Sequence, residues 1–448
     1  MAKYQKYAEY KDSGVEWLED VPREWDIIKI KHLSTVKRGA SPRPIDDPKY
    51  FDDNGEYAWV RIADVSASDM YLLNTTQTMS DLGSSLSVKL EPNQLFLSIA
   101  GTVGKPCINK IKACIHDGFV YFPELKIPNK YLFYVFAGEQ AYKGLGKMGT
   151  QLNLNTDTVG DIKVALPKSQ SDIYKIIEFL DHETAKIDSL IAKQEKLIEL
   201  LKEKRQAVIS HAVTKGLNPN VKMKDSGVEW LGQVPEHWDV IYIKHLTEVK
   251  RGASPRPIDD PKYFDDEGEY AWTRIADVTK AGMYLTDTTQ KLSKLGSSLS
   301  VRLEPNELFL SIAGTVGKPC ITVFKACIHD GFVYFPTLKM NNKFLYYIFE
   351  AGQAYLGLGK MGTQLNLNTD TVGGIKIGLP PNFEIEQIIS YIETQNAKYD
   401  FLILTANKQV SLLQERRTAL ISAAVTGKID VRNWQAPTMI EAHTELSA

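Results

Sequence analysis

Two stretches of the chain carry apolar residues at alternating spacings of three and four, the pattern of a helix that buries one narrow face. They lie within residues 168–213 and 381–428. The apolar positions are Ile173, Ile176, Leu180, Ile187, Leu190, Leu197, Leu201 and Val208 in the first stretch, and Ile385, Ile388, Ile392, Tyr399, Leu402, Leu413 and Leu420 in the second. Held over about six heptads, the pattern predicts two helices of about 40 residues, roughly 60 Å each, that pair with one another. The alternative is two amphipathic helices that each pack on their own domain.

The segments 14–167 and 227–380 show short apolar runs set off by Gly, Pro and Asn, which predicts a mixed but strand-rich domain in each. In the first domain the runs "YAWVRIADV", "QLFLSIAG", "ACIHDGFVYF" and "DIKVALP" are expected to be strands. The run "KYLFYVFAGEQAYKGL" and its counterpart "KFLYYIFEAGQAYLGL" predict a short amphipathic helix.

The chain is a tandem duplication. Its repeat period, the offset given below, is too long for a solenoid. Arg38 corresponds to Arg251 at an offset of 213 (251 − 38), and the strings "LFLSIAGTVGKPCI" and "GKMGTQLNLNTDTVG" each occur twice without a change. In the helical stretches the two copies diverge, and the offset falls to 212, as Arg205 and Arg417 show (417 − 205). Two whole domain-plus-helix units are therefore expected. If one domain was recently copied over the other, its identity is uniform and does not by itself single out functional loops.

The fold class that follows is α+β: two strand-rich globular domains separated by two long antiparallel, coiled-coil-like helices, with a pseudo-two-fold internal repeat. The expected divisions are 1–167 for the first domain, 168–213 for the first helix, 214–226 for a linker, 227–380 for the second domain, 381–428 for the second helix and 429–448 for a tail without an assignable role.

Composition bounds the class of protein only loosely. The 448 residues are 43% hydrophobic and 24% charged, with a net charge of −2, so charge alone does not indicate a nucleic-acid binder. Four cysteines do not make a disulfide framework, and neither a signal peptide nor a membrane-spanning run is evident. A cytoplasmic protein without a membrane partner is expected.

Motifs for catalysis are weak throughout. The string "AGTVGKP" is too short for a phosphate loop and has proline where a magnesium-binding hydroxyl is needed. Cys107, Cys114 and His116 lack paired metal-ligand spacing, so core packing is the better interpretation. The carboxylates of "DDPKYFDD" lack the partners of a nuclease, and no methyltransferase motif or Ser-His-Asp arrangement is present. We expect a chain without catalysis, bound cofactor or metal of its own.

Polar and basic loops are better candidates for function, because the same ones occur in both domains. Three loops of the first domain, 37–43, 101–105 and 147–153, offer cations, hydroxyls and amides of the kinds that contact phosphates and base edges. The predicted DNA-binding residues are Lys37, Arg38, Ser41, Arg43, Thr102, Lys105, Lys147, Thr150, Gln151 and Asn153, with Lys250, Arg251, Ser254, Arg256, Thr315, Lys318, Lys360, Thr363, Gln364 and Asn366 in the second domain.

A structural role remains open for several of these residues. The arginines fit a solvated face with ordinary ion pairs, and "GTQLNLN" fits turn and helix capping. Trp59 and Tyr57 are better interpreted as core residues than as stacking platforms for bases.

The chain resembles the specificity subunit of type I restriction–modification enzymes. The resemblance covers about 10–428 and rests on the entry strings "YKDSGVEWLEDVPREWDI" and "DSGVEWLGQVPEHWDV", the exit "GTQLNLNTDTVGDIKVALP" and the helix end "LIELLKEKRQAVISHAVTKGL". It implies two target recognition domains held apart by two antiparallel helices, each domain reading half of a bipartite site in double-stranded DNA. It also implies docking of two modification subunits, which carry S-adenosylmethionine and methylate adenine, and of restriction subunits, which use ATP and Mg and cleave DNA.

The resemblance assigns the helices to pairing and to subunit docking. The residues expected there are Ile173, Leu180, Ile187, Leu197 and Leu201 of the first helix, and Ile385, Ile392, Leu402, Leu413 and Leu420 of the second.

One departure from the family pattern has a consequence. The family usually pairs dissimilar recognition domains with similar helices, whereas here the domains are nearly identical and the helices differ more. Identical readers related by a two-fold axis predict identical half-sites in inverted orientation, an interrupted palindrome whose spacer is set by the helices. Four residues inserted into one helix are expected to lengthen that spacer. Two other classes stay open: a non-enzymatic coiled-coil scaffold that binds no DNA, and a metal-dependent nuclease with an unrecognised site.

Overall fold

The structure is a computed structural model that describes residues 4–142, 145, 147–148, 151–152, 154–355, 358, 360–361, 364–365 and 367–436, with the backbone alone at 147–148, 151–152, 360–361 and 364–365. The chain divides into two compact units. Unit 1 comprises Met1–Glu195 with Lys408–Ala448, and unit 2 comprises Lys196–Asn407. Each unit therefore holds one globular domain and one part of each long helix.

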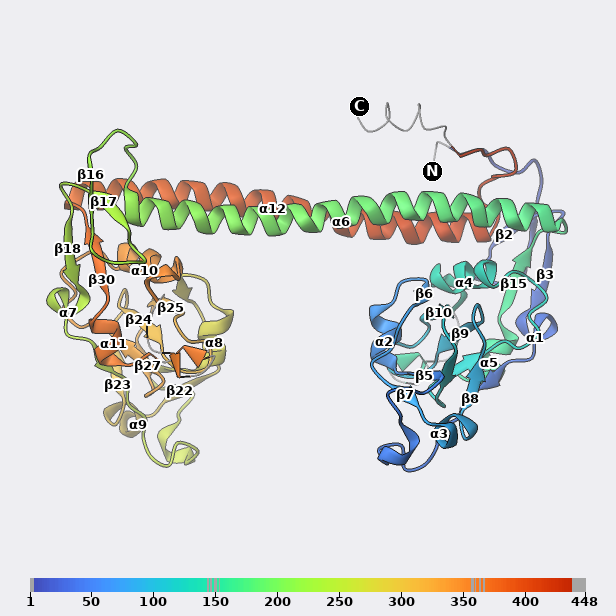
Figure 1. Cartoon of the computed structure of the whole chain (residues 1–448), viewed down its shortest axis with the longest axis horizontal. Coiled ribbons are helices and arrows are strands. Elements are labelled where there is room, and N and C mark those ends of the chain that lie inside the picture. The colour runs from blue at the N-terminus through green and yellow to red at the C-terminus, as the bar shows by residue number, and fades with distance from the viewer. Residues whose placement is uncertain are drawn as a thin grey trace. The chain divides into compact units, whose positions relative to one another are not determined.

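The globular domain of unit 1 is built on two sheets, of five and four strands (Figure 1). In the five-stranded sheet the order is β4 (Lys37–Arg38), β12 (Phe119–Tyr121), β9 (Leu95–Ser98), β10 (Pro106–Asn109) and β6 (Tyr71–Leu72). In the four-stranded sheet it is β7 (Thr78–Met79), β5 (Tyr57–Val60), β11 (Ala113–Ile115) and β8 (Val88–Leu90). Both sheets mix parallel and antiparallel pairs, since β6 and β10 are parallel, as are β5 and β11.

Three two-stranded pairs and several short helices complete the described part of this unit. The strand pairs are β1 (Tyr10–Asp12) with β2 (Asp20–Pro22), β3 (Asp26–Lys29) with β15 (Lys163–Leu166), and β13 (Lys147–Met148) with β14 (Gln151–Leu152). The helices are α1 (Ile30–Leu33), η1 (Pro48–Tyr50), α2 (Ile62–Ala67), α3 (Asp81–Ser85), α4 (Asn129–Ala137), η2 (Gln140–Tyr142) and α5 (Thr156–Asp161).

Unit 2 repeats this arrangement. Its five-stranded sheet is β19 (Lys250–Arg251), β27 (Phe332–Tyr334), β24 (Leu308–Ser311), β25 (Pro319–Thr322) and β21 (Tyr284–Leu285), and its four-stranded sheet is β22 (Gln290–Leu292), β20 (Tyr270–Thr273), β26 (Ala326–Ile328) and β23 (Val301–Leu303). The strand pairs are β16 (Met223–Asp225) with β17 (Gln233–Pro235), β18 (Asp239–Tyr242) with β30 (Lys376–Leu379), and β28 (Lys360–Met361) with β29 (Gln364–Leu365). The short helices are α7 (Ile243–Leu246), η3 (Pro261–Tyr263), α8 (Ile275–Lys280), α9 (Lys294–Ser298), α10 (Asn342–Glu350), η4 (Gln353–Tyr355) and α11 (Thr369–Gly373).

Two of the expected strands are broken by polar residues inside the apolar runs. "YAWVRIADV" forms strand β5 only as far as Val60; helix α2 begins at Ile62, where the Arg61 N–H is capped by the Asp64 carboxylate at 2.8 Å. "ACIHDGFVYF" forms two strands in different sheets, β11 and β12, with His116, Asp117 and Gly118 between them. Both breaks place charged or polar side chains at strand ends, where they reach solvent.

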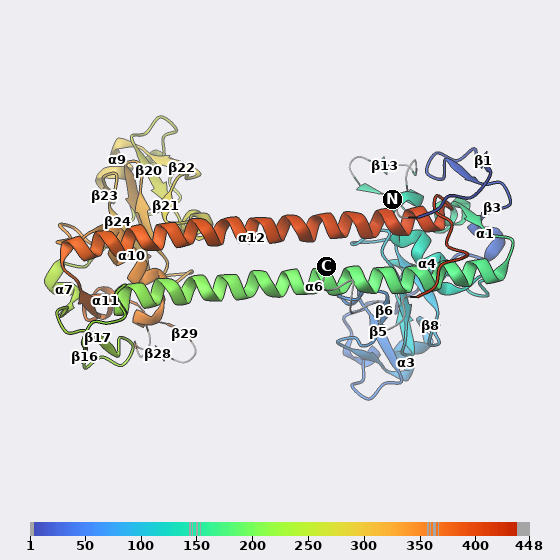
Figure 2. The ribbon, with the colours of Figure 1, turned by 90° about the horizontal axis from the view of Figure 1, so that it is seen from above.

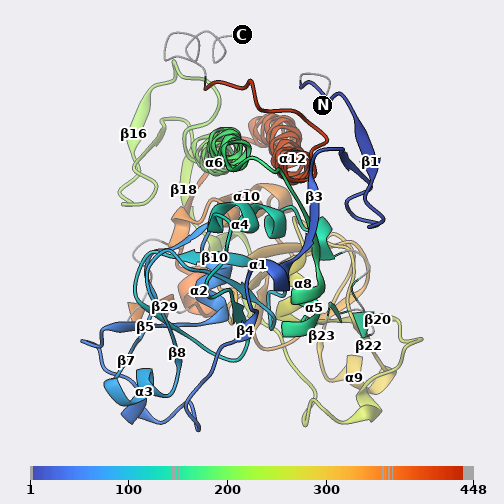
Figure 3. The ribbon, with the colours of Figure 1, turned by 90° about the vertical axis from the view of Figure 1, so that its right-hand side faces the viewer.

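In unit 1, helix α4 lies between the sheets and the long helices (Figure 3). After its first two polar residues, all side chains from Tyr131 to Phe136 are buried, as is expected for a helix covered from both directions. Tyr134 Oη donates to Asp181 Oδ1 at 2.7 Å, and Lys130 forms an ion pair with Asp181 at 2.5 Å. In unit 2 the equivalent ion pair is Lys343 with Glu393 at 2.6 Å, so each domain is fixed to its long helices through the same helix.

The long helices are α6 (Gln170–Lys215, 46 residues) and α12 (Asn382–Val425, 44 residues), and in each unit they run antiparallel (Figure 2). In unit 1, Arg417 Nε donates to Asp188 Oδ1 at 2.7 Å; in unit 2, Arg205 Nη1 donates to Asp400 Oδ1 at 2.8 Å. Both pairs have the same residue sum (188 + 417 = 205 + 400 = 605), so one register holds in both units. The two ion pairs are also equivalent under the 212-residue offset of the repeat.

A continuous seam of buried and half-buried positions follows this register. In α6 it consists of Thr184, Ile187, Ile191, Gln194, Ile198, Leu201, Arg205 and Val208, and in α12 of Ile392, Asn396, Tyr399, Ile403, Ala406, Val410, Leu413, Arg417 and Leu420. The spacing of three and four residues is that of a coiled coil. The predicted fold class, with paired long helices, is confirmed.

Eight of the ten predicted helix residues are buried or half-buried, and two are not. Ile173, Leu180, Ile187, Ile385, Ile392 and Leu420 are buried, and Leu201 and Leu413 are half-buried. Leu197 and Leu402 remain 43% and 37% exposed, because the neighbouring Ile198 and Ile403 occupy the seam instead. Leu197 and Leu402 therefore do not pair the helices.

The segment that follows α12 packs back onto unit 1. Ile429 and Val431 are buried in the core of that unit, and the Trp434 ring stands edge-on to Phe179 at 5.4 Å. The tail, to which the sequence assigns no role, thus has a structural one as far as residue 436, while 437–448 lie outside the described residues.

Within the described part of the chain, no helix has both the length and the uninterrupted apolar character required to cross a bilayer.

Candidate DNA interface

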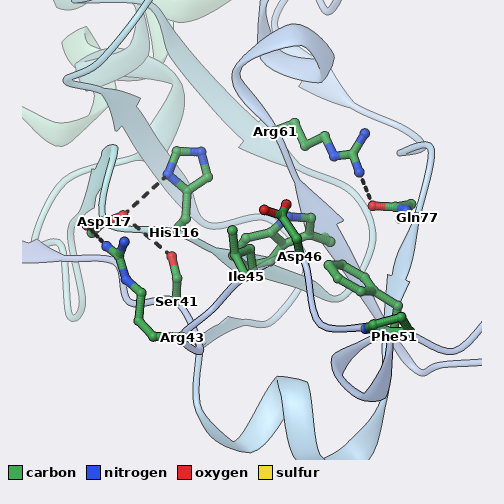
Figure 4. Close-up of a pocket in the computed structure, with 11 residues that line it drawn as sticks. Ser41, Arg43, Ile45, Asp46, Phe51, Arg61, Gln77, His116 and Asp117 are labelled. Atoms are coloured by element: carbon green, nitrogen blue, oxygen red, sulfur yellow. Dashed lines mark hydrogen bonds and ion pairs between the residues drawn. The ribbon is translucent and has the colours of Figure 1, made fainter.

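The turn between β11 and β12 gathers three of the predicted DNA-binding residues around Asp117, of which Figure 4 shows Ser41 and Arg43. Arg38 Nε donates to the Asp117 carbonyl oxygen at 2.6 Å, Arg43 Nη2 to its carboxylate at 2.9 Å, and Ser41 Oγ to the same carboxylate at 3.4 Å. We call Arg38, Ser41, Arg43 and Asp117 the Asp117 cluster. Lys37 precedes Arg38 in β4; it is exposed and lies opposite Tyr121.

Unit 2 builds the same cluster around Asp330. Arg251 Nε donates to its carbonyl oxygen at 2.6 Å, Arg256 Nη2 to its carboxylate at 2.9 Å, and Ser254 Oγ to that carboxylate at 3.2 Å. Lys250 is exposed like its counterpart.

The backbone must come very close for this cluster to form. A Cβ on Gly39 would lie 2.1 Å from the His116 carbonyl oxygen, so only glycine allows the strand that carries Arg38 to approach the turn. The Arg43 side chain is 73% exposed and that of Asp117 42%, so their ion pair contributes little stability. Its effect is to hold exposed cations in place.

Next to the cluster lies an open pocket of about 620 Å³, which we call the Arg61 pocket (Figure 4). It is lined by Ser41, Arg43, Ile45, Asp46, Pro48, Phe51, Trp59, Arg61, Gln77, His116 and Asp117. Trp59 is 4% exposed, in agreement with its interpretation as a core residue. Tyr57, expected to be core as well, is half-buried and donates through its hydroxyl to Glu91 at 2.8 Å.

His116 contributes a neutral ring to this pocket. Its Nδ1 atom accepts the Gly118 N–H at 2.9 Å, which leaves Nε2 to carry the proton. Burial lowers the pKa of His116, an effect only partly opposed by Asp117, so the ring is uncharged at neutral pH. His329 and Gly331 repeat the arrangement in unit 2, where burial also lowers the pKa of the histidine.

The second predicted loop, 101–105, makes a separate group of contacts at the end of α2. Lys105 Nζ donates to the Ser66 carbonyl oxygen at 2.8 Å, and the Thr102 and Ser66 hydroxyls lie 2.6 Å apart. A cation beside the last carbonyls of a helix is favourable, so the contact observed for this lysine is a structural one. In unit 2, Lys318 reaches the Thr279 and Ala281 carbonyls and Thr315 the Thr279 hydroxyl.

The third predicted loop is described only in part. The backbone of Lys147, Gln151, Lys360 and Gln364 forms the hairpins β13–β14 and β28–β29. Thr150, Asn153, Thr363 and Asn366 lie outside the described residues. Nearby, Asn155 caps α5 by accepting the N–H groups of Asp157 and Thr158, both at 2.9 Å, so part of "GTQLNLN" and its continuation is structural.

Among the described residues there is no group of three or more potential metal ligands. All four cysteines are buried, and burial raises the pKa of both Cys107 and Cys114 to about 12, which keeps them as neutral thiols.

Sequence reasoning missed two residues that organise this surface, Asp117 and Gln77. Arg61 belongs to the basic residues near the start of the domain, but it lies outside the three predicted loops. The available signal was the string "HDG", which stands unchanged in both domains inside an apolar run. A charged residue flanked by strands in that way marks a turn at a sheet edge.

Comparisons with known proteins agree with this architecture. The sequence profile of the family described as "Type I restriction modification DNA specificity domain" matches residues 22–199 and 235–410. A "Putative type I restriction enzyme MjaX specificity subunit" from Methanocaldococcus jannaschii is 24% identical, over 94% of this chain and 98% of that protein. The "Type I restriction enzyme MjaIX specificity subunit" of the same organism is 20% identical, over 96% and 99%. A solved chain described under "complex assembly and conformational transition of the type I R-M system" superposes with a TM-score of 0.67 at 14% identity, over 90% of this chain and 98% of that one.

The chain belongs to the type I restriction–modification DNA specificity family and carries two copies of its domain. Within such a system it is a specificity subunit. The scaffold and nuclease alternatives find no support in these comparisons.

Proposed function

We propose that each globular domain reads one half of an interrupted palindrome in double-stranded DNA. The observation that carries this proposal is the repetition of the same exposed side chains, held by the same hydrogen bonds, in both domains: the Asp117 cluster of unit 1 and its counterpart around Asp330. Domains that present the same groups read the same bases. The antiparallel helix register, shared by both units, inverts one half-site relative to the other.

The long helices are proposed to dock the catalytic partners. Leu197, Leu200, Phe401 and Leu404 of unit 2 are 43%, 49%, 67% and 69% exposed, although they lie on helices with a well-formed seam. Outward-facing apolar side chains in such numbers are typical of a protein interface. We assign them, with Leu402, to contacts with modification subunits, which supply S-adenosylmethionine and methylate adenine. Restriction subunits that use ATP and Mg then add to that assembly, and this chain contributes no catalysis.

The test of this function is long-read, modification-sensitive sequencing of DNA from cells that express the chain with its cognate modification subunit. The expected result is methyl-adenine at an interrupted palindrome, with one modified base in each half. As a matched control, a chimera in which 227–380 is exchanged for a recognition domain of different specificity is expected to give an asymmetric site. A bipartite but asymmetric site for the native chain would contradict the equivalence of the two domains, and no modified motif at all would contradict the function.

A second prediction concerns the spacer. The seam repeats every seven residues, so seven residues added to each helix keep its register, whereas four would rotate it. Insertions after Glu195 and after Asn407, which are equivalent positions (407 − 195 = 212), lengthen each helix by roughly 10 Å. The expected result is the same two half-sites separated by a spacer at least one base pair longer, measured by the same sequencing. An unchanged spacer would show that the helices do not set it.

A further inference from the structure

Arg61 and Gln77 form a fixed pair at the edge of the Arg61 pocket (Figure 4). Arg61 is the last residue before α2, and its N–H donates to the Asp64 carboxylate at 2.8 Å. The segment with Gln77 is held to β5, since the Trp59 N–H donates to the Gln77 carbonyl oxygen at 2.9 Å. Arg61 Nη2 then donates to Gln77 Oε1. Backbone hydrogen bonds therefore hold the main chain at Arg61 and Gln77, and the side-chain hydrogen bond joins the two residues.

The same pair occurs in unit 2. Arg274 Nη2 donates to Gln290 Oε1, and the Arg274 N–H donates to the Asp277 carboxylate at 2.9 Å. Trp272 and Gln290 lie opposite each other in the pairing of β20 with β22.

Arg61 differs from the arginines of the Asp117 cluster in its electrostatic surroundings. Arg38 and Arg43 are both bound to Asp117, so a DNA acceptor has to compete with that residue for them. The Arg61 guanidinium is bound to a neutral amide and, within the described part of the chain, to no carboxylate at ion-pair distance. One of its five N–H donors is occupied, and the others remain available on an exposed, oriented fork.

The surroundings of Arg61 also favour a base over a phosphate as the partner of its guanidinium. Asp46 and Asp117 line the same pocket as Arg43 and Arg61, so the two carboxylates balance the two guanidinium groups and the pocket offers a phosphate no net positive charge. The edge of a base pair is uncharged and does not require one. Ile45 and Phe51 add apolar surface that excludes water from a contact made at the pocket edge. Guanine presents two acceptors, N7 and O6, in the major groove, and an arginine fork matches both.

We propose that Arg61 and Arg274 each read a guanine in the half-site of their own domain, with Gln77 and Gln290 as the positioning residues that orient the two guanidinium groups. This inference rests on the proposed function, because it requires that the domains bind DNA. It adds the base that is read and the side chain that reads it.

The experiment changes one domain and uses the other as an internal control. Arg61→Ala, with Arg274 intact, is assembled with the modification subunit, and its binding is measured on DNAs that vary one base pair at a time in either half-site. The expected result is a loss of preference for guanine at one position of one half-site, by about 5- to 140-fold, the equivalent of roughly 1–3 kcal/mol. The other half-site keeps its preference, and Arg274→Ala gives the mirror result. Arg23→Ala, an exposed arginine paired with Glu9 in the N-terminal hairpin region, serves as the unaffected control.

The role of Gln77 is tested by measuring the guanine preference of its half-site separately from the affinity for all DNA sequences. Gln77→Ala releases the guanidinium and is expected to reduce the guanine preference of that half-site without changing the melting temperature. Gln77→Glu keeps the guanidinium oriented but gives it a carboxylate partner, so it is expected to retain the preference while binding to all sequences weakens. Loss of preference in Gln77→Glu equal to that in Gln77→Ala would overturn the positioning role.

Three outcomes would overturn the guanine assignment: a half-site without guanine, no change in Arg61→Ala, or a uniform loss of affinity over all sequences, which marks a phosphate contact. Each of them is observed with a native complex that still binds a bipartite site. Failure of the proposed function is a different result, in which the native complex shows no specific site.

Discussion

Leu180→Ala is expected to lower the free energy of unfolding of unit 1 by about 2–5 kcal/mol and to leave unit 2 almost unchanged. Leu180 is fully buried in the core cluster that also contains Leu420 and Ile421 of the opposite helix. Removing its side chain creates a cavity at the junction of the domain with both long helices. Since the chain has two compact units, we expect two transitions in thermal or denaturant unfolding, of which only one moves.

The repeat supplies the matched variants for this experiment. Ile392 is the equivalent of Leu180 at the 212 offset, is fully buried in unit 2, and is expected to shift the other transition when it is changed to alanine. Leu404→Ala, at a side chain that is 69% exposed, is expected to change stability by no more than about 0.5 kcal/mol. A single transition that Leu180→Ala and Ile392→Ala lower equally would contradict independent unfolding of the two units.

The long helices show how much of a helix pair can be predicted from hydrophobic periodicity. It predicted two long paired helices correctly, because few structures besides paired helices bury residues at a spacing of three and four over many turns. It placed Leu197 and Leu402 in the seam, and the structure has Ile198 and Ile403 there. Leucine and isoleucine stand side by side at these positions, so the period fits either one. Only the partner helix decides which of the two is covered.

The candidate site was predictable only where neighbours in sequence are neighbours in space. Arg38, Ser41 and Arg43 lie on one loop, and the sequence identified them together. What holds them is Asp117, more than 70 residues further along, and a single sequence carries no record of that contact. Arg61 is one of the basic residues near the start of the domain, but it lies outside the three predicted loops, because it stands inside an apolar run that predicts one strand. The helix that begins after it depends on capping by Asp64.

A shortened chain of residues 1–222, with domain 1 and the whole of α6, is expected to form a symmetric homodimer in solution. In unit 1, the end of α12 packs on the domain through Leu420, Ile421, Ala424 and Val425. The 212 offset places Val208, Ile209, Ala212 and Val213 of α6 at these positions, and three of the four residues are the same. A second copy can therefore supply through α6 what α12 supplies in the intact chain.

The register of that homodimer follows from the two ion pairs. Subtracting the offset from the residue sum gives 605 − 212 = 393, and Asp188 with Arg205 meets this sum within α6 alone (188 + 205 = 393). Each copy then offers Asp188 to Arg205 of the other, so the ion pair forms twice.

Sedimentation at micromolar concentration is expected to give twice the monomer mass. Asp188→Arg brings two cations together at both places and is expected to weaken the dimer, and the added change Arg205→Asp is expected to restore it. A shortened chain that stays monomeric would show that the two helices are not interchangeable. A dimer that Asp188→Arg leaves intact would show that its helices meet in another register.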